Sequence, residues 1–379
     1  MSALRGSNFS VFRDRIRAYE GRMISLHVGD SWMEPCPSAR MENLRVDEFP
    51  GMHRYSPPHG RPELLQAIAE RRGVERGRIL VSAGATGCLN SLAMATLEPG
   101  DEVLILAPYW PLIRGVVQVA RGRPVEVPFF VDPAGGVATV DDLEPGAITR
   151  LLSKYLGERT VALYINTPHN PTGRVLSRDQ VQEMAEFCKR HNLWIWSDEI
   201  YENYSYSRPH VSVGEMAPER TFCTYSFTKA YGMTGNRCGY IIGPNRELMF
   251  ELRKVSTHSV YCSPSASQLA AWRVLSDGAD WLVEAARAYQ GAGEAAADVL
   301  GVPRPEGGTF LFLDVRSVLD GRGLIGWLGD CVNKGVLLAP GSSCGADYGG
   351  FVRLCFTSET PELTAEGVGR LRSLLGHGA

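Results

Sequence analysis

The chain has 379 residues and a formal net charge of -3, with 44% hydrophobic and 21% charged residues. This length suits two domains or one large α/β domain with an appendage, and the small net charge excludes bulk attraction to nucleic acid or to an anionic membrane. Nine cysteines contain no CxxC pair, the N-terminus has no apolar signal segment, and no apolar run approaches the ~20 residues of a membrane span. We therefore expect a cytoplasmic protein without a zinc site or a disulfide framework.

Most of the chain alternates between short apolar runs and helical patterns. In chain order, the expected elements are a short polar helix at 10–21, an extended run at 23–28, a helix at 62–72, a strand at 78–82, a turn at 84–87, an apolar helix at 88–97, strands at 102–107, 124–130 and 160–166, a helix at 178–190, and strands at 193–197, 221–225 and 238–243. The run 103–106 is Val-Leu-Ile-Leu, without the polar alternation of a half-exposed strand. This pattern predicts an α/β fold whose mixed, mostly parallel sheet is covered by helices on both faces.

The C-terminal part of the chain changes pattern after two helical stretches. These stretches lie at 263–275 and 281–300, and they are followed by expected strands at 309–315, 335–338 and 352–356 and helices at 324–334 and 361–375. Such a mixture indicates a smaller α+β domain, which the N-terminal segment completes. We expect a large domain at 45–275 and a small domain made of 1–44 and 276–379.

A stretch near residue 230 concentrates groups that suit one kind of ligand. Lys229 follows a short apolar run, with hydroxyls beside it at Ser226 and Thr228, and Arg237 lies beyond a segment with two glycines. A lysine amine can form a Schiff base with an aldehyde, and hydroxyls and a guanidinium fork can hold a phosphate. An aldehyde and a phosphate on one small molecule describe pyridoxal phosphate, although Lys229 taken alone would fit a surface loop.

Three further motifs follow strands of the expected sheet. Gly84-Ala85-Thr86-Gly87 lies between a strand and a helix, where backbone N–H groups can bind an anion, although a tight turn without a ligand has the same pattern. Trp110 follows the strand at 102–107 and is either a core residue or a platform for a planar ring. Asn170 lies in a polar, proline-rich turn at 166–173.

Asp198 follows the very apolar strand at 193–197, where a carboxylate is costly to desolvate without a partner. It could cap the next turn, or it could keep a pyridinium nitrogen protonated so that the ring accepts electrons. Tyr201 lies in the same turn, and for Glu199 we expect a structural role.

In their order along the chain, these motifs resemble those of class I/II aminotransferases of the aspartate aminotransferase type, which are fold-type I pyridoxal phosphate enzymes. The resemblance runs from about residue 26 to residue 356 and is most specific from Ser226 to Tyr240. It implies a mostly parallel seven-stranded sheet sandwiched by helices, a small α+β domain made of both chain ends, pyridoxal phosphate as the cofactor, and no metal.

The resemblance also implies a role for each matching residue. The implied catalytic residues are Lys229, Asp198 and Tyr201. The implied cofactor contacts are Gly84, Ala85, Thr86, Trp110, Asn170, Asp198, Tyr201, Ser226, Lys229 and Arg237, with Tyr55 contributed by the neighbouring subunit of a homodimer. The implied substrate contacts are Gly29, Asn170 and Arg353, of which Arg353 would clamp the α-carboxylate bidentately, through two parallel N–H bonds.

The departures from the family pattern concern the substrate. Asp30-Ser31-Trp32 replaces the usual Glu-Pro-Asp, Cys344 stands where phenylalanine is common, and Thr86 stands where some aspartate-preferring relatives have lysine. A second basic group for a distal carboxylate is not obvious, with Arg40, Arg54 and His258 as the remaining candidates. A neutral or aromatic amino acid is therefore favoured.

The resemblance predicts ping-pong transamination of an L-amino acid to its 2-oxo acid, with the Schiff base at Lys229. One alternative is β-elimination, C–S lysis or decarboxylation on the same scaffold, because the fold does not determine the reaction. A second alternative is a ligand-sensing transcription regulator with an aminotransferase-like domain. The segment before Gly29 is too short for the winged helix-turn-helix domain that such regulators carry.

Overall fold

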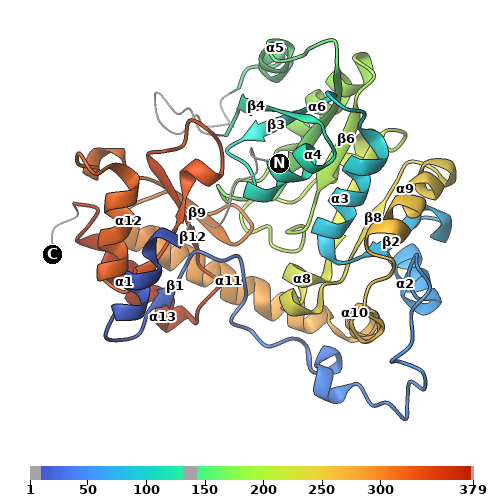
Figure 1. The fold of residues 1–379 in the computed structure, drawn as a ribbon, viewed down its shortest axis with the longest axis horizontal. Coiled ribbons are helices and arrows are strands. Elements are labelled where there is room, and N and C mark those ends of the chain that lie inside the picture. The colour runs from blue at the N-terminus through green and yellow to red at the C-terminus, as the bar shows by residue number, and fades with distance from the viewer. Residues whose placement is uncertain (1–9, 131–142, 377–379) are drawn as a thin grey trace.

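Residues 10–130 and 143–376 are described by a computed structural model. Residues 131–142 of the predicted large domain, and residues 1–9 and 377–379 of the predicted small domain, lie outside the described part. The chain folds into a larger body around a long sheet and a smaller body, in which the blue N-terminal segment lies beside the red C-terminal segments (Figure 1).

Within the described residues, seven strands form the large sheet in the order β2-β8-β7-β6-β5-β3-β4. Their bounds are β2 Ile79–Ser82, β3 Glu102–Ala107, β4 Arg123–Pro128, β5 Thr160–Asn166, β6 Trp194–Asp198, β7 Thr221–Ser226 and β8 Gly239–Ile242. Neighbouring strands are parallel except at β8, which is antiparallel to both β2 and β7. Every residue of β3 is buried. The predicted α/β fold with a mostly parallel, covered sheet is confirmed.

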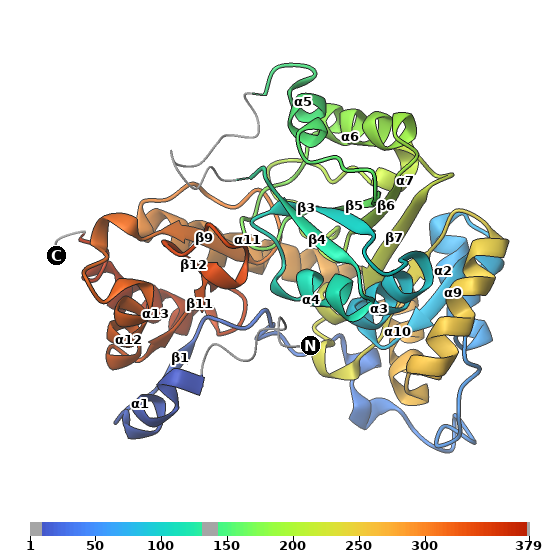
Figure 2. The same cartoon turned by 45° about the horizontal axis from the view of Figure 1, so that its top comes forward.

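Helices cover both faces of this sheet. They are α2 Pro62–Arg72, α3 Gly84–Thr96, α4 Pro111–Val119, α5 Ala147–Ser153, α6 Arg178–Arg190, α7 Val213–Met216, α8 Phe227–Ala230, α9 Arg246–Ser259 and α10 Ser265–Asp277. In Figure 2, α5 and α6 lie above the sheet, and α3 and α4 lie below it. The start of α6 agrees with the sequence because Ser177 and Gln180 form a capping box, in which each side chain bonds the backbone N–H of the other.

Two expectations about the helices need correction. Residues 84–87 were expected as a turn before a helix at 88–97, but they form the first turn of α3. The left-handed conformation of Gly84, with φ of +71°, lets β2 lead almost directly into the helix. Helices α4, α5, α7, α8 and α9 are absent from the elements expected from the sequence. For α9 a signal is present: the side chain of its N-cap residue, Asn245, accepts a hydrogen bond from the backbone N–H of Leu248, and the buried Met249 and Leu252 recur at helical spacing. The helix packs against α3.

The smaller body joins the two chain ends. It contains α1 Arg13–Ala18, β1 Ile24–Ser25, α11 Ala279–Leu300, β9 Phe310–Asp314, α12 Gly323–Asn333, β10 Val336–Leu337, β11 Ala339–Pro340, β12 Phe351–Cys355 and α13 Pro361–Arg372. Strand β1 pairs in parallel with β10, while β12 lies antiparallel between β11 and β9. The predicted small α+β domain made of both ends is confirmed, and its exact boundaries stay a prediction.

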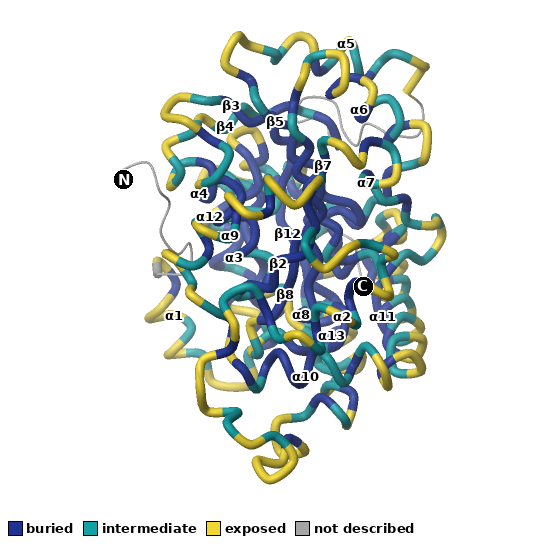
Figure 3. Tube along the Cα trace, turned by 90° about the vertical axis from the view of Figure 1, so that its right-hand side faces the viewer, coloured by how far each residue is buried: buried dark blue, intermediate teal, exposed yellow. Residues whose placement is uncertain are grey.

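Buried residues run through the centre of the molecule, and exposed residues lie mainly on the connecting segments (Figure 3). Across the described ranges, no helix combines the length and the apolar character that a membrane crossing needs.

Candidate active site

The site lies where three neighbouring parallel strands end. Asn166 ends β5, Asp198 ends β6 and Ser226 ends β7; the sheet register pairs Asn166 with Asp198 directly. Ligands of α/β proteins typically bind at the carboxyl ends of parallel strands. A cavity of about 190 Å³ opens there, and its wall consists of Gly29, Ala85, Thr86, Trp110, Asn170, Asp198, Ile200, Tyr201, Ser226, Thr228, Lys229, Arg237, Phe310 and Arg353.

This cavity brings together every site residue predicted from the sequence except Gly84 and Tyr55. Gly84 lies directly behind the wall, since a Cβ atom there would be 2.7 Å from Nη2 of Arg237. Tyr55 is 84% exposed, and its ring packs edge-on against Tyr261 with 5.0 Å between the ring centroids. Tyr55 therefore makes no contact with the cavity of its own chain.

Asp198 presents a buried acceptor to this cavity. Its Oδ2 accepts a hydrogen bond of 2.6 Å from the Tyr164 hydroxyl, whereas its Oδ1 is buried without a partner among the described residues. Burial raises the pKa of Asp198 to about 6, against the opposing effect of the bonds from Tyr164 and from the backbone N–H of Ile200. A ligand with an N–H donor would satisfy Oδ1 and favour the ionised carboxylate.

Lys229 is the buried amine of the site. Its Nζ donates to the backbone carbonyl of Gly29, which belongs to the small domain. Burial is the main cause that lowers the pKa of Lys229; the nearby Cys355 and Asp30 oppose this effect, and the positive charge of Arg353 adds to it. A lysine with a lowered pKa is a better nucleophile and proton acceptor near neutral pH than an exposed lysine.

Arg353 is a second cation of the cavity wall, and its guanidinium is held in place. Its Nη1 donates to Oδ1 of Asn170 over 3.0 Å and its Nη2 donates to the carbonyl of His27 over 2.9 Å. The guanidinium lies 4.4 Å from the centroid of the Phe310 ring, and Nε is buried without a partner among the described residues. A cation oriented in this way is suited to a carboxylate.

Another part of the cavity wall, formed by the start of α3 and the end of β7, combines groups that can bind an anion. The first turn of α3 contributes Ala85 and Thr86, and β7 ends at Ser226, whose Oγ accepts from the backbone N–H of Thr228 over 3.0 Å. The Thr228 hydroxyl is buried without a partner in the described part of the chain. Arg237 has φ of 51°, unusual for a residue other than glycine, and such strain often accompanies a functional position. Together these groups form a cradle for a phosphate.

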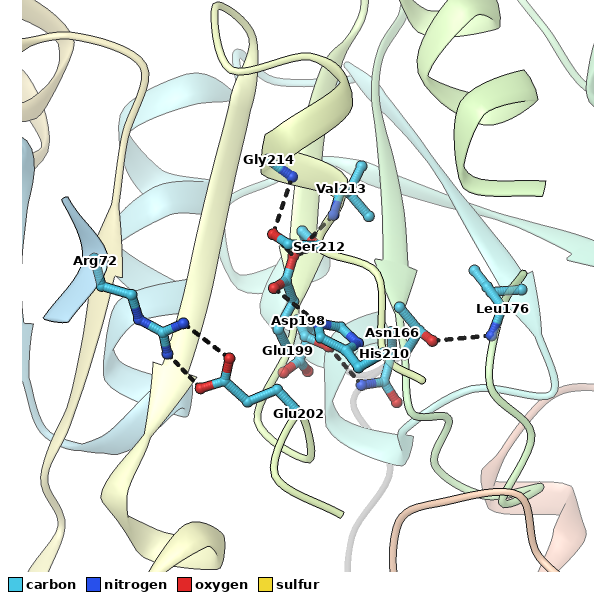
Figure 4. A network of polar contacts seen from close by, with 12 residues as sticks. Arg72, Asn166, Leu176, Asp198, Glu199, Glu202, His210, Ser212, Val213 and Gly214 are labelled. Atoms are coloured by element: carbon cyan, nitrogen blue, oxygen red, sulfur yellow. Dashed lines mark hydrogen bonds and ion pairs between the residues drawn. The ribbon is translucent and has the colours of Figure 1, made fainter. Parts of the chain in front are cut away.

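A buried polar network fixes the turn that carries Asp198 (Figure 4). Glu199 is fully buried and accepts hydrogen bonds from the hydroxyls of Ser197 and Ser212, over 2.7 and 3.0 Å, and from Nε2 of His210 over 3.1 Å. Burial alone would raise the pKa of Glu199, but these bonds and the charge of His210 lower it; the reciprocal interaction raises the pKa of His210 despite its burial. Glu199 is therefore satisfied by partners within the described chain, and its structural role stays a prediction.

Three wall or supporting residues are missing from the sequence-based prediction: Tyr164, Ile200 and Phe310. Tyr164 could have been found, because it precedes Asn166 by two positions on β5 and so shares a face with it. Phe310 belongs to a distant segment, and no local pattern connects it with the site.

The fold and the cavity define an α/β enzyme that holds a lysine, a carboxylate and two arginines around one small-molecule site. Residues 21–371 match the family model of aminotransferases of class I and II. The chain belongs to this family and is an aminotransferase.

Individual relatives have different named substrates. The chain is 32% identical to an aspartate/prephenate aminotransferase of Thermus thermophilus over 327 residues, 83% of this chain and 81% of the relative. It is 30% identical to an arginine–pyruvate transaminase of Pseudomonas aeruginosa over 362 residues, 90% of this chain and 88% of the relative. A solved structure of a Thermus thermophilus aspartate aminotransferase double mutant matches with a TM-score of 0.87 and 28% identity, covering 98% of each chain.

Proposed function

We propose that this chain catalyses pyridoxal phosphate-dependent transamination of an L-amino acid to its 2-oxo acid. The observation that carries the proposal is the buried, unpartnered Oδ1 of Asp198 in the same cavity as the amine of Lys229 and the guanidinium of Arg237. A ring nitrogen, an aldehyde and a phosphate on one molecule would meet these three groups in turn.

The residues present fit the cofactor. Asp198 would accept from the ring nitrogen, Lys229 would hold the aldehyde carbon, and Arg237 would bind the phosphate together with the cradle described above. Trp110 would stack on the ring, and Tyr201 and Asn170 would donate to its phenolic oxygen. When bound, pyridoxal phosphate supplies the aldehyde that captures the substrate amine and the ring that accepts the electrons of the Cα–H bond.

The remaining steps are performed by side chains of this chain. Arg353 binds the substrate α-carboxylate, and Asn170 holds the arginine in orientation. Lys229 moves the proton of the Cα–H bond, because its lowered pKa increases the fraction of the neutral amine that can accept it. Tyr201 stays a proton donor, since burial raises the pKa of its hydroxyl.

We propose a homodimer in which Tyr55, which is 84% exposed and lies outside the wall of its own cavity, reaches the phosphate in the cavity of a second copy. The active site would then be complete only in the dimer. Nine free cysteines fit a reducing compartment, and we propose the cytoplasm.

The composition of the cavity wall also indicates which kind of substrate side chain it can accept. Ile200 and Phe310 contribute apolar surface. Lys229, Arg237 and Arg353 are the cations among the described wall residues, and each has a role in binding the cofactor or the α-carboxylate. A neutral or aromatic side chain therefore fits the wall of one chain best.

A half-reaction tests the proposal. The cofactor-loaded protein is mixed with each common amino acid without a 2-oxo acid, and the cofactor absorbance and the released products are followed. We expect a subset of donors to give their 2-oxo acids in one turnover per site, with further turnover only after an acceptor acid is added. Pyruvate and ammonia released without an acceptor would instead indicate elimination.

Lys229→Ala should abolish both the half-reaction and covalent retention of the cofactor. Lys254→Ala, which removes an exposed lysine of α9, is the matched control and should behave as the wild type. Wild-type turnover in Lys229→Ala would refute the proposal.

A further inference from the structure

Glu126 lies outside the cavity wall and accepts hydrogen bonds from both domains. It belongs to β4, the edge strand of the large sheet, and 19% of its side chain is exposed. Its Oε1 accepts a hydrogen bond of 2.7 Å from the Tyr109 hydroxyl and is paired with Nη1 of Arg114. Its Oε2 accepts from the backbone N–H of Ala346, in the small domain, over 2.8 Å. One carboxylate therefore joins the two domains.

On the large-domain side, the contacts of Glu126 flank Trp110. Trp110 belongs to the cavity wall and is the N-cap residue of α4. Tyr109, which directly precedes it, is buried, and Arg114 follows it by about one helical turn on α4. Because Glu126 binds the chain on both sides of Trp110, it fixes the place of this ring in the wall.

On the small-domain side, the bonded segment leads to Arg353. Ala346 lies in the segment between β11 and β12, and the sheet register pairs Ala339 of β11 with Arg353 of β12. The same segment has a second bond to the large domain, since the carbonyl of Cys344 accepts from the backbone N–H of Tyr109 over 2.8 Å. The segment is thus bonded to the residue before Trp110 and paired with the strand that carries Arg353.

We propose that Glu126 is a positioning residue that fixes the spacing between Trp110, as the platform of the cofactor ring, and Arg353, as the clamp of the substrate α-carboxylate. The inference rests on the proposed function and deepens it, because the ring and the α-carboxylate belong to two molecules that must meet in one geometry. A displacement of about 1 Å caused far from the reacting atoms can cost roughly 100-fold in rate. Supporting contacts of this kind hold binding groups in place.

Glu126→Gln keeps the size of the side chain and replaces one acceptor by a donor. The three groups that Glu126 contacts in the described part of the chain are all donors, so the new NH2 group has to face one of them. We expect the remaining oxygen to face Tyr109 and Arg114, where two donors meet and one is charged. The NH2 group then faces the N–H of Ala346, and the variant releases the small-domain segment.

Two ligands measure the spacing without turnover. Pyridoxine phosphate lacks the aldehyde and occupies the ring and phosphate sites alone, whereas phosphopyridoxyl-L-alanine, the reduced adduct of pyridoxal phosphate with alanine, also carries a carboxylate for Arg353. Both dissociation constants are measured by calorimetry on the cofactor-free protein. We expect Glu126→Gln to change the affinity for pyridoxine phosphate by less than about twofold and to weaken phosphopyridoxyl-L-alanine by roughly tenfold, the effect of one lost bond to a charged group. A linked ligand gains affinity only when both of its ends fit at once.

Hydrogen exchange of the cofactor-free protein reports on the contact itself. In Glu126→Gln the amide of Ala346 should exchange faster, because its acceptor is lost. The matched control is Glu75→Gln, which removes an exposed ion pair with Arg246 outside the cavity wall and should leave the exchange and both ligands unchanged. Tyr109→Phe removes a bond on the large-domain side and should also weaken phosphopyridoxyl-L-alanine selectively, so it provides the test if Glu126→Gln does not fold.

The outcomes separate this inference from the proposed function. Equal weakening of both ligands in Glu126→Gln, or unchanged binding of phosphopyridoxyl-L-alanine, would overturn the positioning role even if the wild type transaminates amino acids. If neither ligand binds the wild type, the proposed function fails. The exchange at Ala346 then still decides on the interdomain contact: faster exchange in Glu126→Gln supports it, and equal exchange in both forms overturns it.

Discussion

Comparing Asp198→Asn with the wild type measures how much the buried, ionised carboxylate of Asp198 lowers the stability of the cofactor-free protein. Burial raises the pKa of Asp198 from 3.8 to about 6. The folded protein therefore holds this proton more tightly than the unfolded chain, so the stability of the cofactor-free protein falls as the pH rises from about 4 to 6 and stays lower above that range. A difference of about two pKa units corresponds to roughly 3 kcal/mol.

Asparagine has nearly the same shape and no proton to lose in this range. The free energy of unfolding of the cofactor-free protein is measured by urea denaturation from pH 4.5 to pH 8 for both forms. Because part of the loss is already complete at pH 4.5, we expect the free energy of unfolding of Asp198→Asn to rise relative to that of the wild type by roughly 2 kcal/mol between pH 4.5 and pH 8. Asp280→Asn, at an exposed position, should follow the wild-type curve.

Adding pyridoxal phosphate should make the wild type more stable than Asp198→Asn. A donor to Oδ1 stabilises the wild-type carboxylate, and the cofactor binds only the folded state. Parallel pH curves for Asp198→Asn and the wild type would refute the reasoning, since the carboxylate would then carry no penalty. Equal stabilisation of both forms by the cofactor would refute the assignment of Oδ1 to the ring nitrogen.

Two further changes probe the surroundings of this carboxylate. Tyr164→Phe removes a bond to the ionised form of Asp198, worth about 1.5–3 kcal/mol, so the pKa of Asp198 in the cofactor-free protein should rise further. The pH range over which the cofactor-free protein loses stability should then extend upward by about 1–2 pH units; an unchanged range would contradict this. His210→Asn leaves Glu199 buried without its cation and should lower the free energy of unfolding at pH 6 by about 3 kcal/mol. The pKa of His210 is raised by its contact with Glu199, so the stability lost in His210→Asn should become smaller once the pH exceeds this raised pKa and the wild-type histidine is neutral. If the variant is less stable than the wild type by the same amount from pH 6 to pH 9, the ion pair is not the cause.

The parts of the fold that the sequence predicts are those in which local pattern and tertiary contacts agree. After Glu102 the residues of β3 are all apolar, and the whole strand is buried, so pattern alone places the strand inside a covered sheet. Helix α9 also has such a pattern, with Asn245 as its N-cap and the buried Met249 and Leu252 at helical spacing, although it is not among the expected elements. The start of α3 depends on the positive φ of Gly84, which a glycine permits but does not require.

The residues of the site can be separated in the same way, into those that the local sequence pattern predicts and those that depend on tertiary contacts. Asn166, Asp198 and Ser226 each end a strand, and adjacent parallel strands bring such positions together without further information. Phe310 and the contact between Asp30 and Thr234 depend on how the small domain packs on the large one. Local sequence patterns do not encode that arrangement.

The neighbours Asp198 and Glu199 show how structure separates a carboxylate that awaits a ligand from one that is already satisfied. Both are fully buried, yet the pKa of Asp198 is raised and the pKa of Glu199 is lowered. Glu199 has hydroxyl donors and a histidine, whereas one oxygen of Asp198 has no partner among the described residues. The hydroxyl of Thr228 and Nε of Arg353 are likewise buried without partners and belong to the wall of the same cavity. Since unsatisfied buried groups are individually costly, their concentration at one place is explained by a polar ligand that satisfies them together.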